Sequence, residues 1–325
     1  MDISPRPSFA RVREPRWVPD IRTSDQTTSS LLRGASDGPV ADPVVNDAHD
    51  NTRTVAEFLK RVLHRDSLDG KHMPLANVVH ELDDTGEPVD NAHWSPSGRD
   101  MHYGDGPAET VPYTKSLDVI AHEMAHGITG FTSRLKYDGQ SGALNESFSD
   151  VIGEGVQQWH ANRRSFGSPD AARAATWLLG EDHFRDPSGA TALRSMRDPR
   201  STPLDLESGR VPQPDHMRDY YTTDLDSGGV HINSGIPNKA AYETAARLGT
   251  EKLVKIWYDA FTTKLGRDAT FDDAARATVE SARELYGKGD VPRAVRSAWQ
   301  SVGLLVDADH PSLKEPSTYE LDLDS

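Results

Sequence analysis

The segment that decides the fold is residues 117–128, LDVIAHEMAHGI, in which apolar side chains recur at the spacing of an α-helix. His122 and His126 stand four residues apart in it, so on a helix both imidazoles share a face and can reach one metal ion. Glu123 would stand beside that ion. Zinc suits this arrangement, because it binds two histidine nitrogens and a carboxylate and leaves one position for water.

A second motif follows about twenty residues later, GALNESFSD at 142–150. Glu146 and Asp150 are one helical turn apart, so both carboxylates face the same way. One can bind the metal, while the other accepts a hydrogen bond from an imidazole N–H and fixes the orientation of that ring. Paired acids also occur on many solvated helix faces, so this motif alone leaves both interpretations open.

The third motif is DSGGVHINSG at 226–235. Its paired glycines allow the backbone to approach a cleft closely, and Asp226 stands near His231, which it can orient. Such a histidine can donate a hydrogen bond to an oxyanion as it forms on a polarised carbonyl. A single histidine beside glycines is more often structural, and only the combination of the three motifs favours a hydrolytic site.

Composition narrows the function classes. The chain has 325 residues, with 36 Lys and Arg against 51 Asp and Glu, and a formal charge of −15. This acidic balance argues against binding to a nucleic-acid backbone. The absence of cysteine excludes disulfides, a thiol nucleophile and cysteine-ligated metal sites. No stretch approaches the roughly 20 apolar residues of a membrane helix, and residues 1–30 contain no continuous apolar signal core. We therefore expect a soluble enzyme or binding protein.

The sequence pattern also predicts how the chain is divided. Residues 1–43, rich in proline and arginine, are expected to be a leader or short propeptide with a linker, outside the core. Two roles stay open for the leader: a pro-segment trimmed near the linker between Gly34 and Val44, or a transport or partner-binding arm. Residues 44–135 are expected to form an α/β lobe that includes the zinc helix. Residues 136–306 would form a helical lobe, and residues 307–325 an acidic solvated tail.

Strand patterns precede most of the helical ones. Val55, Phe58, Leu59 and Val62 mark one face of a helix that ends near His64. Short alternating runs predict strands within 76–82 and 101–106. Helices are then expected over 116–129, 142–161, 239–264, 270–286 and 291–304. Strands first and helices afterwards favour an α+β protein in two lobes.

The three motifs, together with NAHWSPSGRDMHYGDG at 91–106, LRSM at 193–196 and SGIPNKAAY at 234–242, resemble the thermolysin-like family of zinc metallopeptidases. The resemblance covers about residues 44–305. HMRDY at 216–220, SGIPNKA and the short leader are most similar to the protealysin branch. The resemblance to the family implies a two-lobed thermolysin-like α+β fold, with a β-rich N-terminal lobe, a mainly helical C-terminal lobe and the zinc helix between them.

The resemblance also implies roles for individual residues. His122, His126 and Glu146 would bind one catalytic zinc, and Glu123 would be the general base. Asp150 and Asn145 would hold the ligand histidines. His231 and Tyr137 would stabilise the oxyanion, with Asp226 orienting His231. Substrate would be bound in a cleft lined by Asn91, Ala92, Trp94, Val119, Leu179, Leu193 and Arg194.

Two departures from the family pattern affect calcium and specificity. Asp118 and Glu181 match residues of the family's double calcium site, but Gln157 and Leu178 replace expected carboxylates. Because calcium takes six to eight oxygen ligands, we expect at most a reduced site with one weak ion. In the pocket for the residue after the scissile bond, Val119, Leu179 and Leu193 stay apolar. Polar or aromatic residues replace apolar ones at Thr110, Tyr113 and His183.

The resulting hypothesis is a zinc-dependent neutral endopeptidase that cuts on the N-terminal side of hydrophobic residues. The alternatives are a narrow-specificity processing protease or effector, and a catalytically idle zinc protein that binds another protein through its cleft. The expected partners are protein or peptide substrates, with no nucleic acid and no membrane, and a monomer is expected. The family resemblance implies secretion, whereas the lack of a visible signal leaves cytoplasmic location or leaderless export open.

Overall fold

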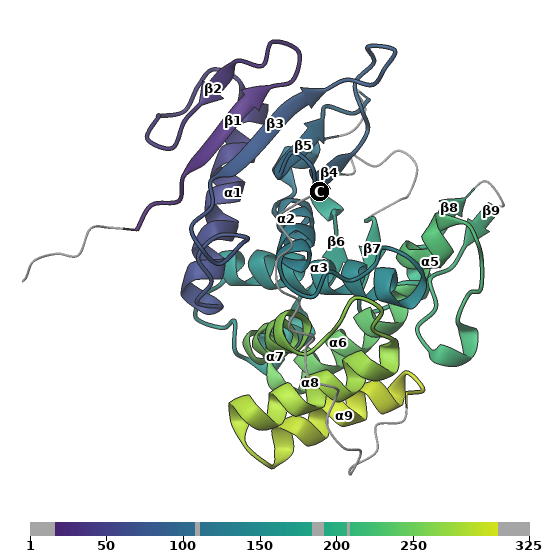
Figure 1. The fold of residues 1–325 in the computed structure, drawn as a ribbon. Coiled ribbons are helices and arrows are strands. Elements are labelled where there is room, and N and C mark those ends of the chain that lie inside the picture. The colour runs from purple at the N-terminus through teal and green to yellow at the C-terminus, as the bar shows by residue number, and fades with distance from the viewer. Residues whose placement is uncertain (1–16, 108–110, 184–191, 207–208, 305–325) are drawn as a thin grey trace, which may run out of the picture.

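The computed structural model describes residues 17–107, 111–183, 192–206 and 209–304. A sheet-rich part forms the upper half of the molecule in Figure 1, and a helical part forms the lower half. Helices α2 (Leu117–Phe131) and α3 (Gly139–Ala161) lie between the two. The expectation of an α+β fold with the histidine-bearing helix between two lobes is therefore confirmed.

The upper part is built on a five-stranded sheet in the order β2-β1-β3-β5-β4. β1 pairs parallel with β3 and β3 pairs parallel with β5, while the two edge strands run antiparallel to their neighbours. The strands are β1 (Ile21–Asp25), β2 (Leu31–Arg33), β3 (Leu75–Glu81), β4 (Ala92–Ser95) and β5 (Asp100–Gly104).

Helix α1 (Pro43–Val62) packs against β1 and β3. It begins where Asp42 caps the backbone N–H of Val44 and proline occupies the first turn, a position that needs no amide donor. The predicted apolar face of this helix, from Val55 to Val62, is buried as expected. Burial of that face fixes the helix on the sheet.

The prediction that residues 1–43 lie outside the core is wrong for the part that the structure describes. β1 and β2 belong to the sheet, and the side chain of Ile21 is 0% exposed. The sequence of β1, IRTSD, offers only one apolar residue, so its alternation escaped detection. Cleavage between Gly34 and Val44 would cut both strands from the rest of the chain. Residues 1–16 and the proposed acidic tail, 307–325, lie outside the described residues.

The lower part consists mainly of helices that follow short strands and turns. The expected helix over 239–264 is in fact two helices, because Gly249 interrupts it with φ of 87°. A Cβ at this glycine would lie 2.2 Å from the carbonyl oxygen of Gly167, so no other residue fits there without movement. The other expected helices, over 116–129, 142–161, 270–286 and 291–304, are confirmed.

The remaining elements complete this part. The α-helices are α4 (Pro169–Ala174), α5 (Asp226–Asn233), α6 (Gly235–Leu248), α7 (Thr250–Thr263), α8 (Phe271–Tyr286) and α9 (Asp290–Ser301). The strands form two short antiparallel pairs, β6 (Leu178–Leu179) with β7 (Arg194–Ser195) and β8 (Leu204–Leu206) with β9 (Gly209–Val211). Single 3₁₀ turns lie at Tyr113–Lys115, Glu181–His183, Pro199–Ser201 and Met217–Asp219. None of the helices in the described part of the chain has the length and apolar character that crossing a membrane requires.

Candidate active site

Two histidines from α2 and one glutamate from α3 meet where these helices pack together. The Nε2 atoms of His122 and His126 lie 3.0 Å apart. The carboxylate of Glu146 approaches both, with Oε1 3.3 Å from Nε2 of His126 and Oε2 3.5 Å from Nε2 of His122. Glu146 and His122 are nearly fully buried, so these atoms face one another with little water between them.

This arrangement fits a bound cation. The Nδ1 atoms of His122 and His126 face the acceptor oxygens of Asp150 at 2.7 Å and Asn145 at 3.0 Å. A proton on each Nδ1 leaves two Nε2 lone pairs pointing at each other, an arrangement that a shared metal ion resolves. Oε2 of Glu146 is buried and has no hydrogen-bond partner among the described residues. Two nitrogens and one oxygen so disposed are ligands that zinc prefers.

The carboxylates around His122 and His126 favour a positive charge between the two Nε2 atoms and Glu146. Burial lowers the pKa of His122, but its contacts with Asp150 and Glu146 outweigh burial and raise the pKa to about 10. Burial raises the pKa of Glu146, and the neighbouring histidines, His231 foremost, bring it well below its ordinary value. The carboxylate is therefore ionised, and a proton or a metal cation can supply the charge that it attracts.

Asp150 fixes the orientation of His122 from behind. Arg194 of β7 donates to both oxygens of Asp150, from Nε at 2.9 Å and from the second guanidinium nitrogen at 2.8 Å. Asn238 of α6 donates to Oδ2 at 2.7 Å. Although burial raises the pKa of Asp150, Arg194 and His122 lower it below its ordinary value, so this carboxylate stays charged.

Glu123 stands at the open side of the cluster. Its Oε1 lies 3.9 Å from Nε2 of His122, farther than either oxygen of Glu146 lies from its histidine. Its Oε2 accepts a hydrogen bond from the backbone N–H of Trp94 at 3.2 Å. Both glutamates are close to the histidines, but only Glu123 is also held by a strand of the upper lobe.

A third group of side chains faces His122, His126 and Glu146 from α5 and from the connection between α2 and α3. The hydroxyl of Tyr137 lies 3.1 Å from Nε2 of His231 and donates to Oε1 of Glu146 at 2.6 Å. Oδ1 of Asp226 lies 2.5 Å from Nδ1 of His231, and Oδ2 accepts from its backbone N–H at 2.9 Å. The predicted oxyanion group is thus together in space.

The charges around His231 and Tyr137 leave both side chains able to donate a hydrogen bond. Burial lowers the pKa of His231, but Glu146 and Asp226 raise it above its ordinary value overall. Burial and the charge of Glu146 both raise the pKa of the Tyr137 hydroxyl, which keeps its proton. The raised pKa makes His231 easier to protonate than a free imidazole, and Tyr137 stays neutral.

The glycines before His231 have the conformation that the sequence suggested. Ser227, Gly228 and Gly229 adopt φ of 50°, 80° and 78°, so the chain makes a left-handed turn before the helix proper begins. A Cβ at Gly228 would lie 2.9 Å from the backbone nitrogen of Gly139 at the start of α3. The turn thereby brings His231 against the helix that carries Glu146.

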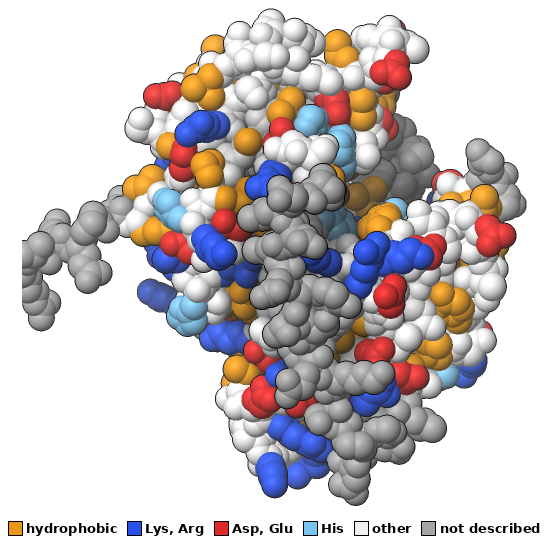
Figure 2. Space-filling model, in the orientation of Figure 1, with side chains coloured by type: hydrophobic (Ala, Val, Ile, Leu, Met, Phe, Trp, Pro, Cys, Tyr) orange, Lys and Arg blue, Asp and Glu red, His pale blue; other side chains and the backbone are white. Residues whose placement is uncertain are grey.

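A cavity of about 660 Å³ between the upper and lower parts of the molecule is lined by His122, Glu123, His126, Tyr137, Glu146 and His231. Figure 2 shows the visible face of both parts, with histidine side chains gathered on the sheet-bearing part. Tyr113 also lines the cavity, and its ring stacks on His183 with centroids 3.8 Å apart. Thr110 lies outside the described residues. Every residue predicted to bind substrate is in the cavity wall: Asn91, Ala92, Trp94, Val119, Leu179, Leu193 and Arg194.

Sequence reasoning missed several supporting contacts. Asn238 was not assigned a role, although it follows His231 by seven residues, which is the spacing of two helical turns. The hydroxyl of Ser149 lies 3.2 Å from Nδ1 of His126, beside Asn145. His93 lines the cavity between two residues that were predicted. The backbone donor of Trp94 carries no side-chain signal and could not have been found.

Comparison with known proteins identifies the family. The family model for "Thermolysin metallopeptidase, catalytic domain" matches residues 23–130, and that for "Thermolysin metallopeptidase, alpha-helical domain" matches residues 133–304. This chain belongs to the thermolysin family of metallopeptidases. The finding confirms the thermolysin-like fold and the peptidase class expected from the sequence.

Individual relatives agree with this assignment. Protease PrtS of Photorhabdus sp. (strain Az29) is 38% identical over 299 residues, which cover 90% of this chain and 76% of that protein. An extracellular metalloprotease of Pectobacterium carotovorum subsp. carotovorum is 37% identical, over 90% of this chain and 81% of that protein. The solved precursor of protealysin, a metalloproteinase from Serratia proteamaculans, superposes with a TM-score of 0.80 at 35% identity and covers 91% of each chain.

Membership in the thermolysin family establishes a zinc-dependent neutral endopeptidase that acts on proteins or peptides. Neutral protease NprE of Bacillus pumilus, 40% identical over 79% of this chain and 76% of that protein, is a further relative. Several relatives are named as extracellular enzymes. A narrow effector or an idle binding module is not favoured by these similarities.

This thermolysin-type chain also contains buried acids outside the group formed by His122, His126 and Glu146. Burial raises the pKa of Glu154 well above its ordinary value, and Asp118 and Glu181 add to the increase, against a hydrogen bond from Gln158 at 2.9 Å. Burial raises the pKa of Asp118 to about 6, although the backbone N–H groups of Val119 and Gly180 donate to its carboxylate. Burial therefore makes Glu154 harder to ionise than an exposed glutamate.

The substitution Glu154→Gln is expected to stabilise the folded protein at pH 8 in calcium-free buffer. The pKa of this carboxyl is higher in the folded state than in the unfolded state. The free energy of unfolding of the wild type therefore falls as the pH rises from the unfolded-state pKa through the folded-state pKa. The amide of the variant does not titrate, so the variant does not lose stability in this way. Its melting temperature should exceed that of the wild type at pH 8, and the difference should shrink towards pH 4.5, the ordinary pKa of the carboxyl. Glu87→Gln, at an exposed position, is the control. A variant less stable than the wild type at pH 8 would contradict the assignment.

Proposed function

We propose that the chain cleaves peptide bonds on the N-terminal side of apolar residues, with His122, His126 and Glu146 as the zinc ligands and Glu123 as the general base. One observation carries the proposal. The two Nε2 atoms lie 3.0 Å apart, and each has an oxygen of Glu146 within 3.5 Å, in the wall of a cavity about 660 Å³ in volume with Glu123 at the open side.

Bound zinc would polarise the scissile carbonyl and acidify a water molecule. Glu123 would take the proton of that water and deliver it to the leaving amine. The backbone N–H of Trp94 holds one oxygen of this carboxylate at 3.2 Å and leaves the other directed at the histidines. Its position beside the cluster, and not the hydrogen bond, makes Glu123 the candidate base.

Tyr137 and His231 would stabilise the negative charge that develops on the carbonyl oxygen. Their donor atoms lie 3.1 Å apart and face the same cavity, so both can reach one oxygen. Asp226 would orient the ring of His231, and its charge helps to raise the pKa of that imidazole. Asn145 and Asp150 would do the equivalent for the ligand histidines.

Substrate selection would depend on the apolar wall of the cavity. Val119, Leu179 and Leu193 line it and would receive the side chain that follows the scissile bond. Arg194 is held by Asp150 and can donate to a substrate carbonyl, while Asn91 and Ala92 would hold the peptide backbone. A Leu- or Phe-like side chain suits this pocket.

The first test is hydrolysis of a blocked Gly–Leu peptide by the wild type and by Glu123→Ala, both confirmed to contain zinc. We expect the wild type to cleave it and the variant to be slower by about a hundredfold or more, because a general base contributes about 10²–10⁴ in rate. A matched Gly–Glu peptide should be cleaved more slowly than Gly–Leu. Equal rates for wild type and variant would remove Glu123 from this role, and faster cleavage of Gly–Glu would contradict the pocket assignment.

The second test concerns the oxyanion group. His231→Ala should lower turnover about a hundredfold, while the zinc content stays unchanged, because His231 supplies a donor and not a ligand. Steady-state kinetics and metal analysis of the same preparation measure both quantities. The control is His160→Ala, which removes an exposed histidine of α3. Turnover of His231→Ala at the wild-type rate would exclude His231 from the mechanism.

For calcium, we propose one weak site that includes Asp118 and Glu181. The proximity of Glu154 to both supports an acidic cluster, whereas Gln157 and Leu178 provide no carboxylates for a double site. Isothermal titration of the zinc-loaded protein should therefore detect no more than one weakly bound calcium ion per chain. Two tightly bound ions would refute the proposal.

We further propose that the chain is secreted and that its two lobes divide near residues 135 and 136. The extracellular relatives support secretion, and the two family models, which meet between residues 130 and 133, support the division. Residues 17–43, including β1 and β2, belong with the first lobe, so a propeptide would be limited to the residues before them.

A further inference from the structure

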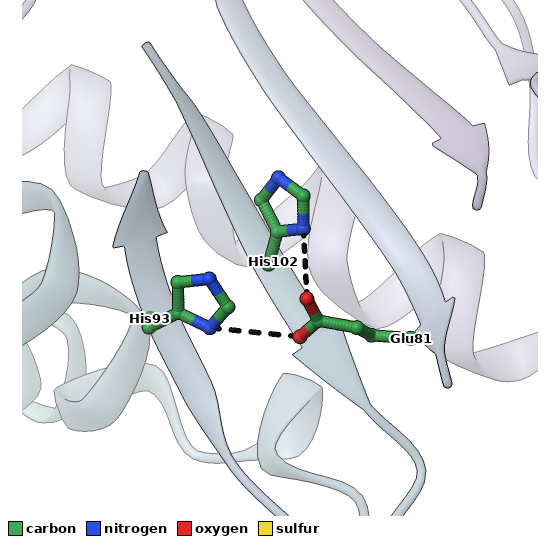
Figure 3. A group of neighbouring side chains, drawn as sticks. All are labelled: Glu81, His93 and His102. Atoms are coloured by element: carbon green, nitrogen blue, oxygen red, sulfur yellow. Dashed lines mark hydrogen bonds and ion pairs between the residues drawn. The ribbon is translucent and has the colours of Figure 1, made fainter. Parts of the chain in front are cut away.

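A second group of metal-binding side chains lies on the sheet, apart from the catalytic cluster. His93 of β4, His102 of β5 and Glu81 of β3 come from three neighbouring strands, and Figure 3 shows both imidazoles directed at the carboxylate. Nδ1 of His102 lies 3.1 Å from Oε1 of Glu81, and Nδ1 of His93 lies 3.5 Å from Oε2. One atom from each residue lies within 4.8 Å of the other two.

The register of the sheet places the two histidines side by side. His93 and His102 are direct partners in the antiparallel pair of β4 and β5, so their side chains emerge on the same face. Their rings stack with centroids 5.0 Å apart and an interplanar angle of 20°. The neighbouring partners, Ala92 and Tyr103, are buried on the opposite face.

A β-bulge brings the glutamate to this face. Simple alternation along β3 would turn Glu81 inward with Val79, which is buried. Instead, the pairing with β5 shifts between Val79 and Glu81, and His80 between them adopts φ of 58°. The extra residue turns Glu81 to the face that carries His102. The ring of His80 is held between Asp105 at 2.8 Å and Asp42 at 3.0 Å, which fixes the bulge.

The carboxylate of Glu81 is incompletely satisfied by the chain itself. Its side chain is 12% exposed, and Oε2 is buried without a hydrogen-bond partner among the described residues. A buried carboxylate oxygen without a partner is costly, so one directed at a histidine 3.5 Å away calls for a cation between them.

The second ring nitrogen of His102 faces a carboxylate, as does that of His122, the proposed catalytic ligand. Nε2 of His102 lies 3.2 Å from Oδ1 of Asp100, just as the outward nitrogen of His122 faces Asp150. Metal-binding histidines commonly donate their second N–H to a carboxylate in this way. The separations from Glu81, 3.1 and 3.5 Å, also match those of the catalytic cluster, 3.0 to 3.5 Å.

From these observations we propose that Glu81, His93 and His102 bind a second zinc ion. Two imidazole nitrogens and one carboxylate oxygen suit zinc better than calcium or magnesium, which prefer oxygen ligands alone. His93 is 41% exposed, so an ion can enter from solvent and a water molecule can complete the coordination. The ion joins the three strands β3, β4 and β5 on their outer face.

This site adjoins the catalytic cavity without belonging to it. His93 lines the cavity, and the next residue, Trp94, donates its backbone N–H to Glu123. A metal ion that ties β4 to its neighbours therefore also fixes the strand that holds the candidate base. The second ion has a structural role at the edge of the cleft.

The proposal is tested by zinc stoichiometry of the full chain, measured by mass spectrometry after equilibration with buffered excess zinc. The wild type should hold two equivalents of zinc. The double variant His93→Gln/His102→Gln should hold one. The variant His126→Gln should also hold one, which is the ion bound by Glu81, His93 and His102. The control His160→Gln should hold two. Asp100→Asn, which changes no ligand, should weaken the second ion about 10- to 100-fold and leave the first unaffected.

Two results would overturn the proposal. One is a wild type that holds a single equivalent under these conditions, and the other is a second equivalent that survives in His93→Gln/His102→Gln. If the double variant does not fold, anomalous diffraction from wild-type crystals at the zinc edge decides the question, since a peak among Glu81, His93 and His102 is required. Because every readout is metal content or position, failure here leaves the peptidase assignment intact.

Discussion

The buried carboxylate of Asp150 holds the centre of the molecule together. It accepts from Arg194 of β7 and Asn238 of α6, faces His122 of α2, and is itself part of α3. Removing one partner of a buried, hydrogen-bonded charge typically costs about 3–5 kcal/mol, because the remaining charge is left without compensation. The packing of four elements and the orientation of the His122 ring therefore depend on the same few atoms.

This arrangement explains why the cavity lies where it does. α2 and α3 form its floor, the upper sheet contributes β4 as one wall, and α5 contributes His231 from the other side. Each lobe supplies a different part of the proposed chemistry, since the backbone of Trp94 holds Glu123 while the turn before His231 brings it to Glu146. Small changes in how the lobes approach each other would alter all of these distances at once.

Much of the site could be predicted from the sequence, because its residues lie on helices with regular spacing. Four-residue intervals placed His122 with His126 and Glu146 with Asp150 correctly on shared faces. The spacing of residues along a helix does not predict contacts between distant elements, such as the hydrogen bond that Asn238 donates to Asp150. The bulge at His80 also escaped, because a left-handed φ at a residue other than glycine has no reliable sequence signal.

The fold shows the same contrast. Amphipathic helices such as α8 and α9 were recognised from their apolar period, whereas β1 was assigned to a leader because its residues are mostly polar. Its parallel pairing with β3 has a consequence for folding kinetics. α1 and its flanking loops separate Ile21 from Leu75 in the sequence, so the pairing is non-local and its loop-closure entropy opposes it until the contacts are made. We expect the sheet to close later than the α2–α3 pair, whose contacts are close in sequence, and β1 to be among the last elements to join the native structure.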